Sequence, residues 1–195
     1  MIIIRKDQLK IIDPTSEPMR SRMPVFDFAE HSAEDIDMMV KVLTRKMIEL
    51  GGIGLSANQL GLNYRVFVMG IDGHSTAVFN PEILERIGEP ETFKEGCLSY
   101  PGIFMQIKRP PNIRARWQNS KGEVREDLFS GLTARVFQHE FDHMEGTDFT
   151  VGVSSLKLKL AKEKYQKKKK KLIREHAIAT MKKAIEDGQE NTARI

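Results

Sequence analysis

Apolar residues recur every three or four positions in two parts of the chain, and this spacing predicts helices. The first run covers residues 36–50, follows the candidate N-cap Ser32 and stops at Gly51. The second run covers residues 132–145. A third, much more basic helix is expected from Ser155 onward. Apart from alanine, the aliphatic residues that can anchor it are Leu156, Leu158, Leu160, Leu172, Ile173, Ile178, Met181 and Ile185.

Shorter apolar segments lie between the first two helices. RVFVMG (65–70) and TAVFN (76–80) are expected to be strands, and NIRARWQ (112–118) and EVREDLF (123–129) a hairpin around the turn NSKG. The segments 13–30, 51–61 and 93–102 are expected to be irregular, since they are rich in proline or glycine. The predicted fold is therefore α+β, with short antiparallel strands around a central helix, a helix near the N-terminus and a long basic helix at the C-terminus.

Charge divides the chain unevenly. Residues 1–156 contain 18 Lys and Arg against 22 Asp and Glu, whereas residues 157–195 contain 13 against 5. We therefore expect a globular domain at 1–155 and a basic helical extension at 156–195. A strongly basic segment is either a solvated helix or a surface for a polyanion, for which ribosomal RNA is the specific hypothesis.

The sequence contains no apolar run long enough for a membrane span, so no membrane partner is expected. The start, MIIIRKDQLK, has too short an apolar core for a signal peptide, and Ile2–Ile4 are expected to form a short strand or an anchored terminus. A single cysteine allows no internal disulfide. These features predict a cytoplasmic protein.

The segment QHEFDHMEG (138–146) lies at the end of the predicted central helix. His139 and His143 are four positions apart and share one helix face, so both can bind the same ion. Glu140 is offset enough to reach a metal-bound water without being a ligand, which is the arrangement of H-E-x-x-H metal sites. The alternative is a pair of ordinary helix histidines beside an exposed glutamate.

A catalytic metal usually has three protein ligands and one open position. The only cysteine, Cys97 in EGCLSYPG, is the candidate third ligand, although alone it would be a small buried apolar residue. A thiolate with two imidazoles suits Fe²⁺, Zn²⁺, Co²⁺ or Ni²⁺. Upstream, GGIGLSANQLG lacks the pattern of a phosphate-binding loop, and the Gln59 amide in it is a suitable donor to a developing oxyanion.

Three motifs, GIGLSANQ (52–59), EGCLS (95–99) and QHEFDH (138–143), occur in this order and resemble the signature motifs of the peptide deformylase family. The resemblance covers roughly residues 1–150. It implies that the catalytic domain binds one divalent metal, with Fe²⁺ as the usual native ion and Zn²⁺, Ni²⁺ or Co²⁺ as substitutes. The implied metal ligands are Cys97, His139 and His143.

The resemblance also implies the catalytic groups. Glu140 would be the general base and acid, and the Gln59 amide and the backbone N–H of Leu98 would stabilise the oxyanion. The backbone of Ile53, Gly54 and Gly96 would hold the peptide like an added strand.

Four further positions bear on this interpretation. Glu95 and Arg109 match a family pair that fixes the cysteine loop, unless they form a weak surface ion pair. Arg135 replaces an aliphatic residue often found near the methionine pocket, so it either gives that pocket a polar rim or points outward. Ser56 stands where the family commonly has alanine, a small change from which no loss of activity is expected.

The implied activity is hydrolysis of the formyl group from formyl-methionyl peptides emerging from a ribosome, in a bacterium or from a phage gene within one. Two alternatives stay open on the residues alone. One is a zinc metallopeptidase of the H-E-x-x-H kind, which normally takes its third ligand from downstream. The other is a basic nucleic-acid-binding protein with a structural metal, which would need a fourth protein ligand.

Overall fold

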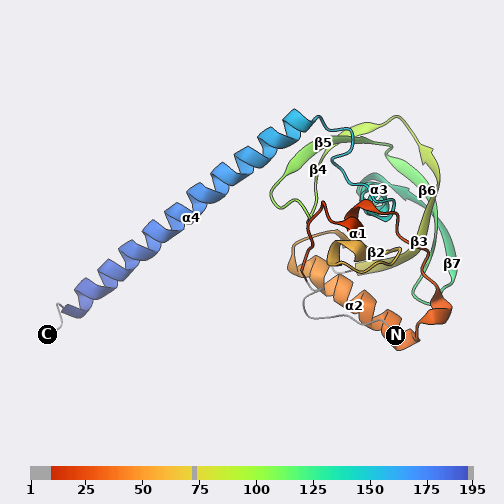
Figure 1. The fold of residues 1–195 in the computed structure, drawn as a ribbon, viewed down its shortest axis with the longest axis horizontal. Coiled ribbons are helices and arrows are strands. Elements are labelled where there is room, and N and C mark those ends of the chain that lie inside the picture. The colour runs from red at the N-terminus through yellow and green to blue at the C-terminus, as the bar shows by residue number, and fades with distance from the viewer. Residues whose placement is uncertain (1–9, 72–73, 193–195) are drawn as a thin grey trace. The chain divides into compact units, whose positions relative to one another are not determined.

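The computed structural model describes residues 10–71 and 74–192 of the chain (Figure 1). Residues 1–9 lie outside this range, and with them the predicted strand or anchor at Ile2–Ile4. The chain divides into two compact units, residues 1–152 and residues 153–195. Each unit is described separately below.

The first unit is built on a five-stranded antiparallel sheet with the strand order β1-β2-β3-β6-β7. The predicted hairpin is present as β6 and β7, and β3 extends well beyond the five residues expected from the sequence. The strands of this sheet are β1 (Gly54–Ser56), β2 (Val66–Ile71), β3 (His74–Ile87), β6 (Asn112–Gln118) and β7 (Val124–Ser130).

The two long helices of this unit, α2 (Ala33–Glu49) and α3 (Gly131–Met144), pack on opposite faces of the sheet. Alternation along β2 explains the arrangement, since successive side chains of a strand point to opposite faces. Val66 and Val68 belong to the core under α2, whereas Phe67 and Met69 belong to the core under α3. The sheet thereby buries both faces, and the observed architecture is the α+β class expected from the sequence.

The segment expected to be irregular at 93–102 instead begins within a second sheet. Strands β4 (Glu91–Gly96) and β5 (Phe104–Arg109) form a two-stranded hairpin. The expectation was wrong because Pro101, Gly102 and the other turn-forming residues belong only to the connection between the strands. Residues 51–61 also contain structure that was not expected, namely β1 and the 3-10 turn η3 (Ala57–Leu60), because β1 pairs with β2. Two short helices interrupt the proline-containing segment, α1 (Glu17–Arg20) and η2 (Phe28–Glu30).

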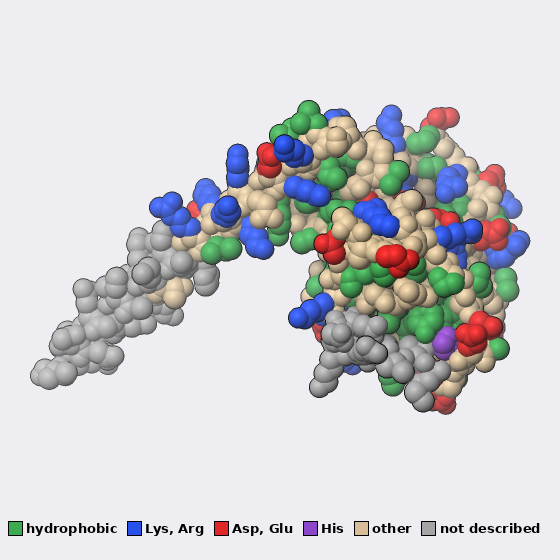
Figure 2. Space-filling view, viewed as in Figure 1, with side chains coloured by type: hydrophobic (Ala, Val, Ile, Leu, Met, Phe, Trp, Pro, Cys, Tyr) green, Lys and Arg blue, Asp and Glu red, His purple; other side chains and the backbone are tan. Residues whose placement is uncertain are grey.

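The second unit contains the helix α4 (Ser155–Thr192). Its apolar side chains at Leu156, Leu160, Leu172 and Ile173 are exposed. Figure 2 shows Lys and Arg side chains on the described part of this helix. Within residues 10–71 and 74–192, no helix combines the length and the apolar character that crossing a membrane requires.

Candidate metal centre

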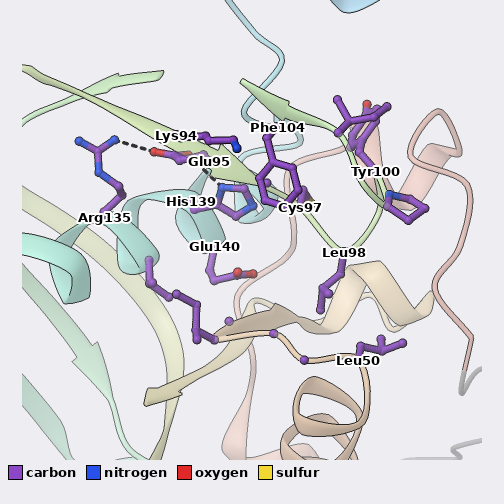
Figure 3. Close-up of a pocket in the computed structure, with 18 of the residues that line it drawn as sticks. Leu50, Lys94, Glu95, Cys97, Leu98, Tyr100, Phe104, Arg135, His139 and Glu140 are labelled. Atoms are coloured by element: carbon purple, nitrogen blue, oxygen red, sulfur yellow. Dashed lines mark hydrogen bonds and ion pairs between the residues drawn. The ribbon is translucent and has the colours of Figure 1, made fainter. Parts of the chain in front are cut away.

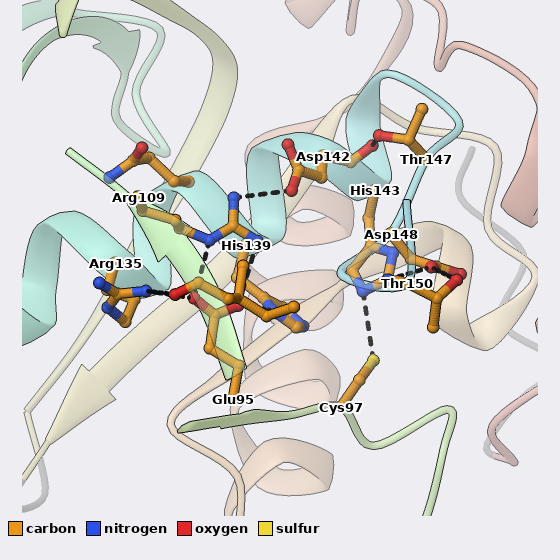
Figure 4. Close-up of polar contacts among 12 residues, drawn as sticks. Glu95, Cys97, Arg109, Arg135, His139, Asp142, His143, Thr147, Asp148 and Thr150 are labelled. Atoms are coloured by element: carbon orange, nitrogen blue, oxygen red, sulfur yellow. Dashed lines mark hydrogen bonds and ion pairs between the residues drawn. The ribbon is translucent and has the colours of Figure 1, made fainter. Parts of the chain in front are cut away.

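Helix α3 and the segment after β4 bring the three predicted metal ligands together. The ligand atoms of Cys97, His139 and His143 all lie within 4.8 Å of one another. The Cys97 sulfur is 3.4 Å from Nε2 of His143 (Figure 4). The two imidazole rings are 5.2 Å apart because one helical turn separates them. One thiol and two imidazoles are a donor set that fits a divalent transition metal.

The two histidines lie in different electrostatic surroundings. Burial, followed by the charge of His139, lowers the pKa of His143 to about 3, which keeps its lone pair available. At His139 burial acts in the same direction, but hydrogen bonds with Cys97 and Glu95 outweigh it and raise the pKa to about 10. These partners favour positive charge at this ring. A metal ion held by these ligands would take the place of the proton that His139 otherwise binds.

Glu95 connects the histidine to the body of the protein. Its Oε2 lies 3.2 Å from Nδ1 of His139, which leaves Nε2 of that ring for a metal. Arg109 donates two hydrogen bonds to the same carboxylate, at 2.8 and 3.1 Å, and a third to Asp142 at 2.8 Å (Figure 4). Both members of the Glu95–Arg109 pair are buried, so the alternative of a weak surface ion pair was wrong. Burial acts to raise the pKa of Glu95, but hydrogen bonds from His139 and the arginines outweigh burial and lower this pKa to about 2.

Arg135 does not point outward, and that alternative was also wrong. It is only 8% exposed and donates to Glu95 Oε1 at 2.7 Å. It also donates to the backbone carbonyls of Glu91 at 2.8 Å and Ile107 at 3.2 Å. Its guanidinium carbon lies 5.3 Å from the centre of the Phe93 ring. The guanidinium of Arg135 therefore hydrogen-bonds to the β4–β5 hairpin, and Arg135 also forms part of the cavity wall.

Glu140 follows His139 on α3 and is 3% exposed (Figure 3). Burial raises the pKa of its carboxyl to about 7, and its Oε2 has no hydrogen-bond partner within the described ranges. A Cβ atom on Gly54 would lie 2.4 Å from Glu140 Oε1, so only glycine leaves room for this carboxylate. The site therefore holds a buried acid–base group whose pKa suits proton transfer near neutral pH.

Gln59 reaches the centre from η3. Its Nε2 donates to the Cys97 sulfur at 3.4 Å and to Ser99 Oγ at 3.0 Å. Its Oε1 accepts from the backbone N–H of Ser56 at 3.0 Å and from the Ser56 hydroxyl at 3.1 Å. The carboxamide is therefore oriented with its donors toward the candidate metal ligand.

These groups border a cavity of about 520 Å³ (Figure 3). Its wall includes apolar residues that the sequence did not distinguish from core positions, among them Phe93, Phe104 and Val136. All of the predicted site residues except His143 line this cavity: Ile53, Gly54, Gln59, Gly96, Cys97, Leu98, Arg135, His139 and Glu140.

A further anchor of the cysteine loop was not predicted. The Tyr100 hydroxyl donates to Asp148 at 2.8 Å, and Arg20 forms an ion pair with the same carboxylate at 2.9 Å. This cluster joins the loop after Cys97 to α1 and to the segment after α3. No sequence signal indicates it, because its three members lie far apart along the chain.

Comparisons with known proteins agree with this site. Residues 9–159 match the family model described as polypeptide deformylase. The peptide deformylase of Thermotoga petrophila is 43% identical over 141 residues, which cover 72% of this chain and 84% of that protein.

Solved structures show the same fold. A peptide deformylase from Synechococcus elongatus in complex with actinonin has a TM-score of 0.74 at 27% identity, and the match covers 84% of this chain and 88% of that one. A class I type b peptide deformylase from Acinetobacter baumannii with Met-Ala-Ser bound has a TM-score of 0.68 at 25% identity, covering 72% and 94%. The resemblance expected from the three motifs is confirmed, and the chain belongs to the polypeptide deformylase family.

Proposed function

We propose that this enzyme hydrolyses the amide bond between a formyl group and the N-terminal methionine of a nascent peptide, releasing formate. The observation that carries the proposal is the convergence of Cys97, His139 and His143 beside a buried Glu140. Family membership does not favour either of the two alternatives. These are a metallopeptidase of the H-E-x-x-H kind and a nucleic-acid-binding protein with a structural metal.

Cys97, His139 and His143 would hold one divalent ion. Fe²⁺ is the native ion that we propose, with Zn²⁺, Ni²⁺ or Co²⁺ as substitutes that the same donor set accommodates. When bound, such an ion supplies Lewis acidity that activates water and polarises the formyl carbonyl. Glu95 keeps the His139 ring in place through Nδ1.

Glu140 would move the protons. Its carboxylate takes a proton from the attacking water and delivers one to the amine that leaves. A pKa raised by burial to about 7 suits both directions, because neither protonation state is strongly disfavoured at neutral pH. The Gly54 backbone leaves the space that this carboxylate needs.

Gln59 and the backbone N–H of Leu98 would stabilise the negative charge that develops on the formyl oxygen when water attacks the formyl carbon. The Gln59 amide already directs its N–H donors toward Cys97, and Leu98 directly follows that residue. Donors fixed before the reaction stabilise developing charge without a cost of reorganisation.

The peptide would lie extended between the backbone of Ile53–Gly54 and that of Gly96, with its methionine side chain in the cavity. A Cβ atom on Gly96 would lie 2.6 Å from the Phe104 ring, so a larger residue at this position would displace that ring. Arg135, already bound to Glu95, would shape the polar end of this pocket rather than meet the substrate as a free charge.

The test is anaerobic purification with metal analysis, followed by a formate-release assay on a formyl-Met peptide. Glu140→Ala should keep its metal and lose most turnover, because the ligands remain while proton transfer is lost. Cys97→Ser should lose metal affinity or change metal preference. Unchanged metal content and activity in Cys97→Ser would contradict the ligand assignment.

We further propose that the enzyme works in the cytoplasm, in a bacterium or from a phage gene, and that α4 binds ribosomal RNA. Residues 157–183 contain 12 Lys and Arg against Glu163 and Glu175. Lysine-rich binding to phosphates weakens steeply with salt. Deleting residues 157–195 should weaken co-sedimentation with ribosomes while short formyl-peptides are still hydrolysed. Unchanged co-sedimentation at low salt would contradict this role of α4.

A further inference from the structure

We propose that Ser56 is a positioning residue, whose hydroxyl fixes the orientation of the Gln59 amide in the active site. The inference rests on the proposed role of Gln59 as an oxyanion donor. It assigns a function to a side chain that touches neither substrate nor metal ligands directly.

Two hydrogen bonds from one residue converge on a single atom. The backbone N–H of Ser56 lies 3.0 Å from Gln59 Oε1, and the Ser56 hydroxyl lies 3.1 Å from the same oxygen. Ser56 is completely buried and Gln59 is only 2% exposed. No bulk water is therefore available to replace the hydroxyl if it is removed.

The other end of the amide carries the donors. Gln59 Nε2 contacts the Cys97 sulfur at 3.4 Å and Ser99 Oγ at 3.0 Å. A carboxamide can rotate by half a turn and exchange its oxygen and nitrogen with little change in shape. That rotation would place Oε1 toward the Cys97 sulfur and the future oxyanion, and would place the Nε2 donors against the backbone N–H of Ser56, which can only donate. In the observed orientation the Ser56 hydroxyl adds a second hydrogen bond to Oε1, at 3.1 Å, and so strengthens the orientation that catalysis needs.

The simpler interpretation is a helix cap. Ser56 precedes η3, and the pair Ser56 and Gln59 forms a capping box for that turn. A cap contributes to stability but has no special effect on the transition state. The Ser56 hydroxyl also has Glu140 as a neighbour with which it can hydrogen-bond. The experiment must therefore separate action through Gln59 from capping and from action through Glu140.

A double-mutant cycle makes this separation. Wild type, Ser56→Ala, Gln59→Ala and the double variant are loaded with Ni²⁺ and assayed for formate release from formyl-Met-Ala-Ser. Ser56→Ala should lower kcat about threefold to tenfold with KM nearly unchanged, the range expected for one neutral hydrogen bond. In the Gln59→Ala background the same substitution should lower kcat no further. An equal loss in both backgrounds, or no loss in either, would overturn the inference.

A second measurement does not depend on turnover. The side-chain amide resonances of Gln59 are assigned in a ¹H–¹⁵N spectrum by their absence from Gln59→Ala. Ser56→Ala should shift this pair because its oxygen has lost a hydrogen bond. An unchanged pair of resonances would overturn the inference.

Ser32→Ala is the matched control for loss of a cap. The Ser32 hydroxyl caps α2 by accepting from the N–H of Asp35 at 3.1 Å, and Ser32 does not line the cavity. This variant should lose thermal stability without a change in kcat. Failure of the proposed function remains distinguishable, because Gln59→Ala with full kcat would refute the role of Gln59 itself. A slow Gln59→Ala beside a fully active Ser56→Ala would refute only the role of Ser56.

Discussion

Replacing Glu95 with glutamine should destabilise the protein by about 3–5 kcal/mol, the usual cost of removing one partner from a buried ion pair. The carboxylate accepts three N–H bonds from Arg109 and Arg135, at 2.7 to 3.1 Å, and faces the His139 ring. Glutamine has nearly the same shape but no charge. Both guanidinium groups would therefore remain about nine-tenths buried beside an amide that offers a single acceptor atom.

Urea unfolding followed by circular dichroism measures this cost, with the protein metal-free and metal-loaded. Glu82→Gln is the matched control, since Glu82 pairs with Arg116 at 3.6 Å on an exposed strand surface. Such an exposed pair should contribute less than about 1 kcal/mol. The loaded form should show a second effect in Glu95→Gln, namely metal affinity that is about 10- to 100-fold lower in competition with a chelator. A cost for Glu95→Gln as small as that of the control would refute a stabilising role for this network.

Other substitutions test how the rest of the structure supports the site. Phe137→Ala should lower the free energy of unfolding in urea by about 3–5 kcal/mol, because this fully buried ring packs in the core between α3 and the sheet. A decrease below about 1 kcal/mol would contradict this and would show that neighbouring side chains fill the space. Arg65→Met should cost about 1.5–3 kcal/mol by the same measurement, since Arg65 donates to the Met144 carbonyl at the end of α3, and an unchanged midpoint would contradict this. Asp148→Asn should reduce stability at pH 7 but have less effect near pH 3. Burial acts to raise the pKa of the Asp148 carboxyl, but its hydrogen bonds outweigh burial, and the pKa lies below the usual 3.8. The ionised carboxylate therefore adds stability above pH 3.8, and this stability is lost as the pH falls through the pKa of the folded state. An equal loss at both pH values would contradict this.

The sequence predicted the elements whose signals are local. The spacing of apolar residues and the Ser32 cap predicted α2, and the cap is observed as a bond of 3.1 Å to the Asp35 N–H. The turn NSKG between two alternating segments predicted the β6–β7 hairpin. The four-residue spacing of His139 and His143 predicted that both side chains lie on one face of α3. Each of these signals depends only on residues within a few positions of one another.

The sequence did not predict features that depend on distant partners. Arg135 could not be placed, because the Glu95 carboxylate that binds it lies 40 positions away in the sequence and reaches it through the β4–β5 hairpin. The β4–β5 hairpin itself was not predicted, because the turn-forming residues after Gly96 led us to expect the whole segment 93–102 to be irregular. The Tyr100–Asp148 contact joins two segments with no pattern that relates them.

These distant contacts explain why the predicted ligands converge at all. Helix geometry fixes His139 relative to His143, but it does not fix either of them relative to Cys97, which belongs to a loop. Glu95 links the cysteine loop to the helix, because it lies two residues before Cys97 and its carboxylate also hydrogen-bonds to the His139 ring. A change at Glu95 should therefore alter both the distance between the thiol and the imidazoles and the stability of the hairpin. The two effects predicted for Glu95→Gln, on unfolding and on metal affinity, consequently have one physical origin.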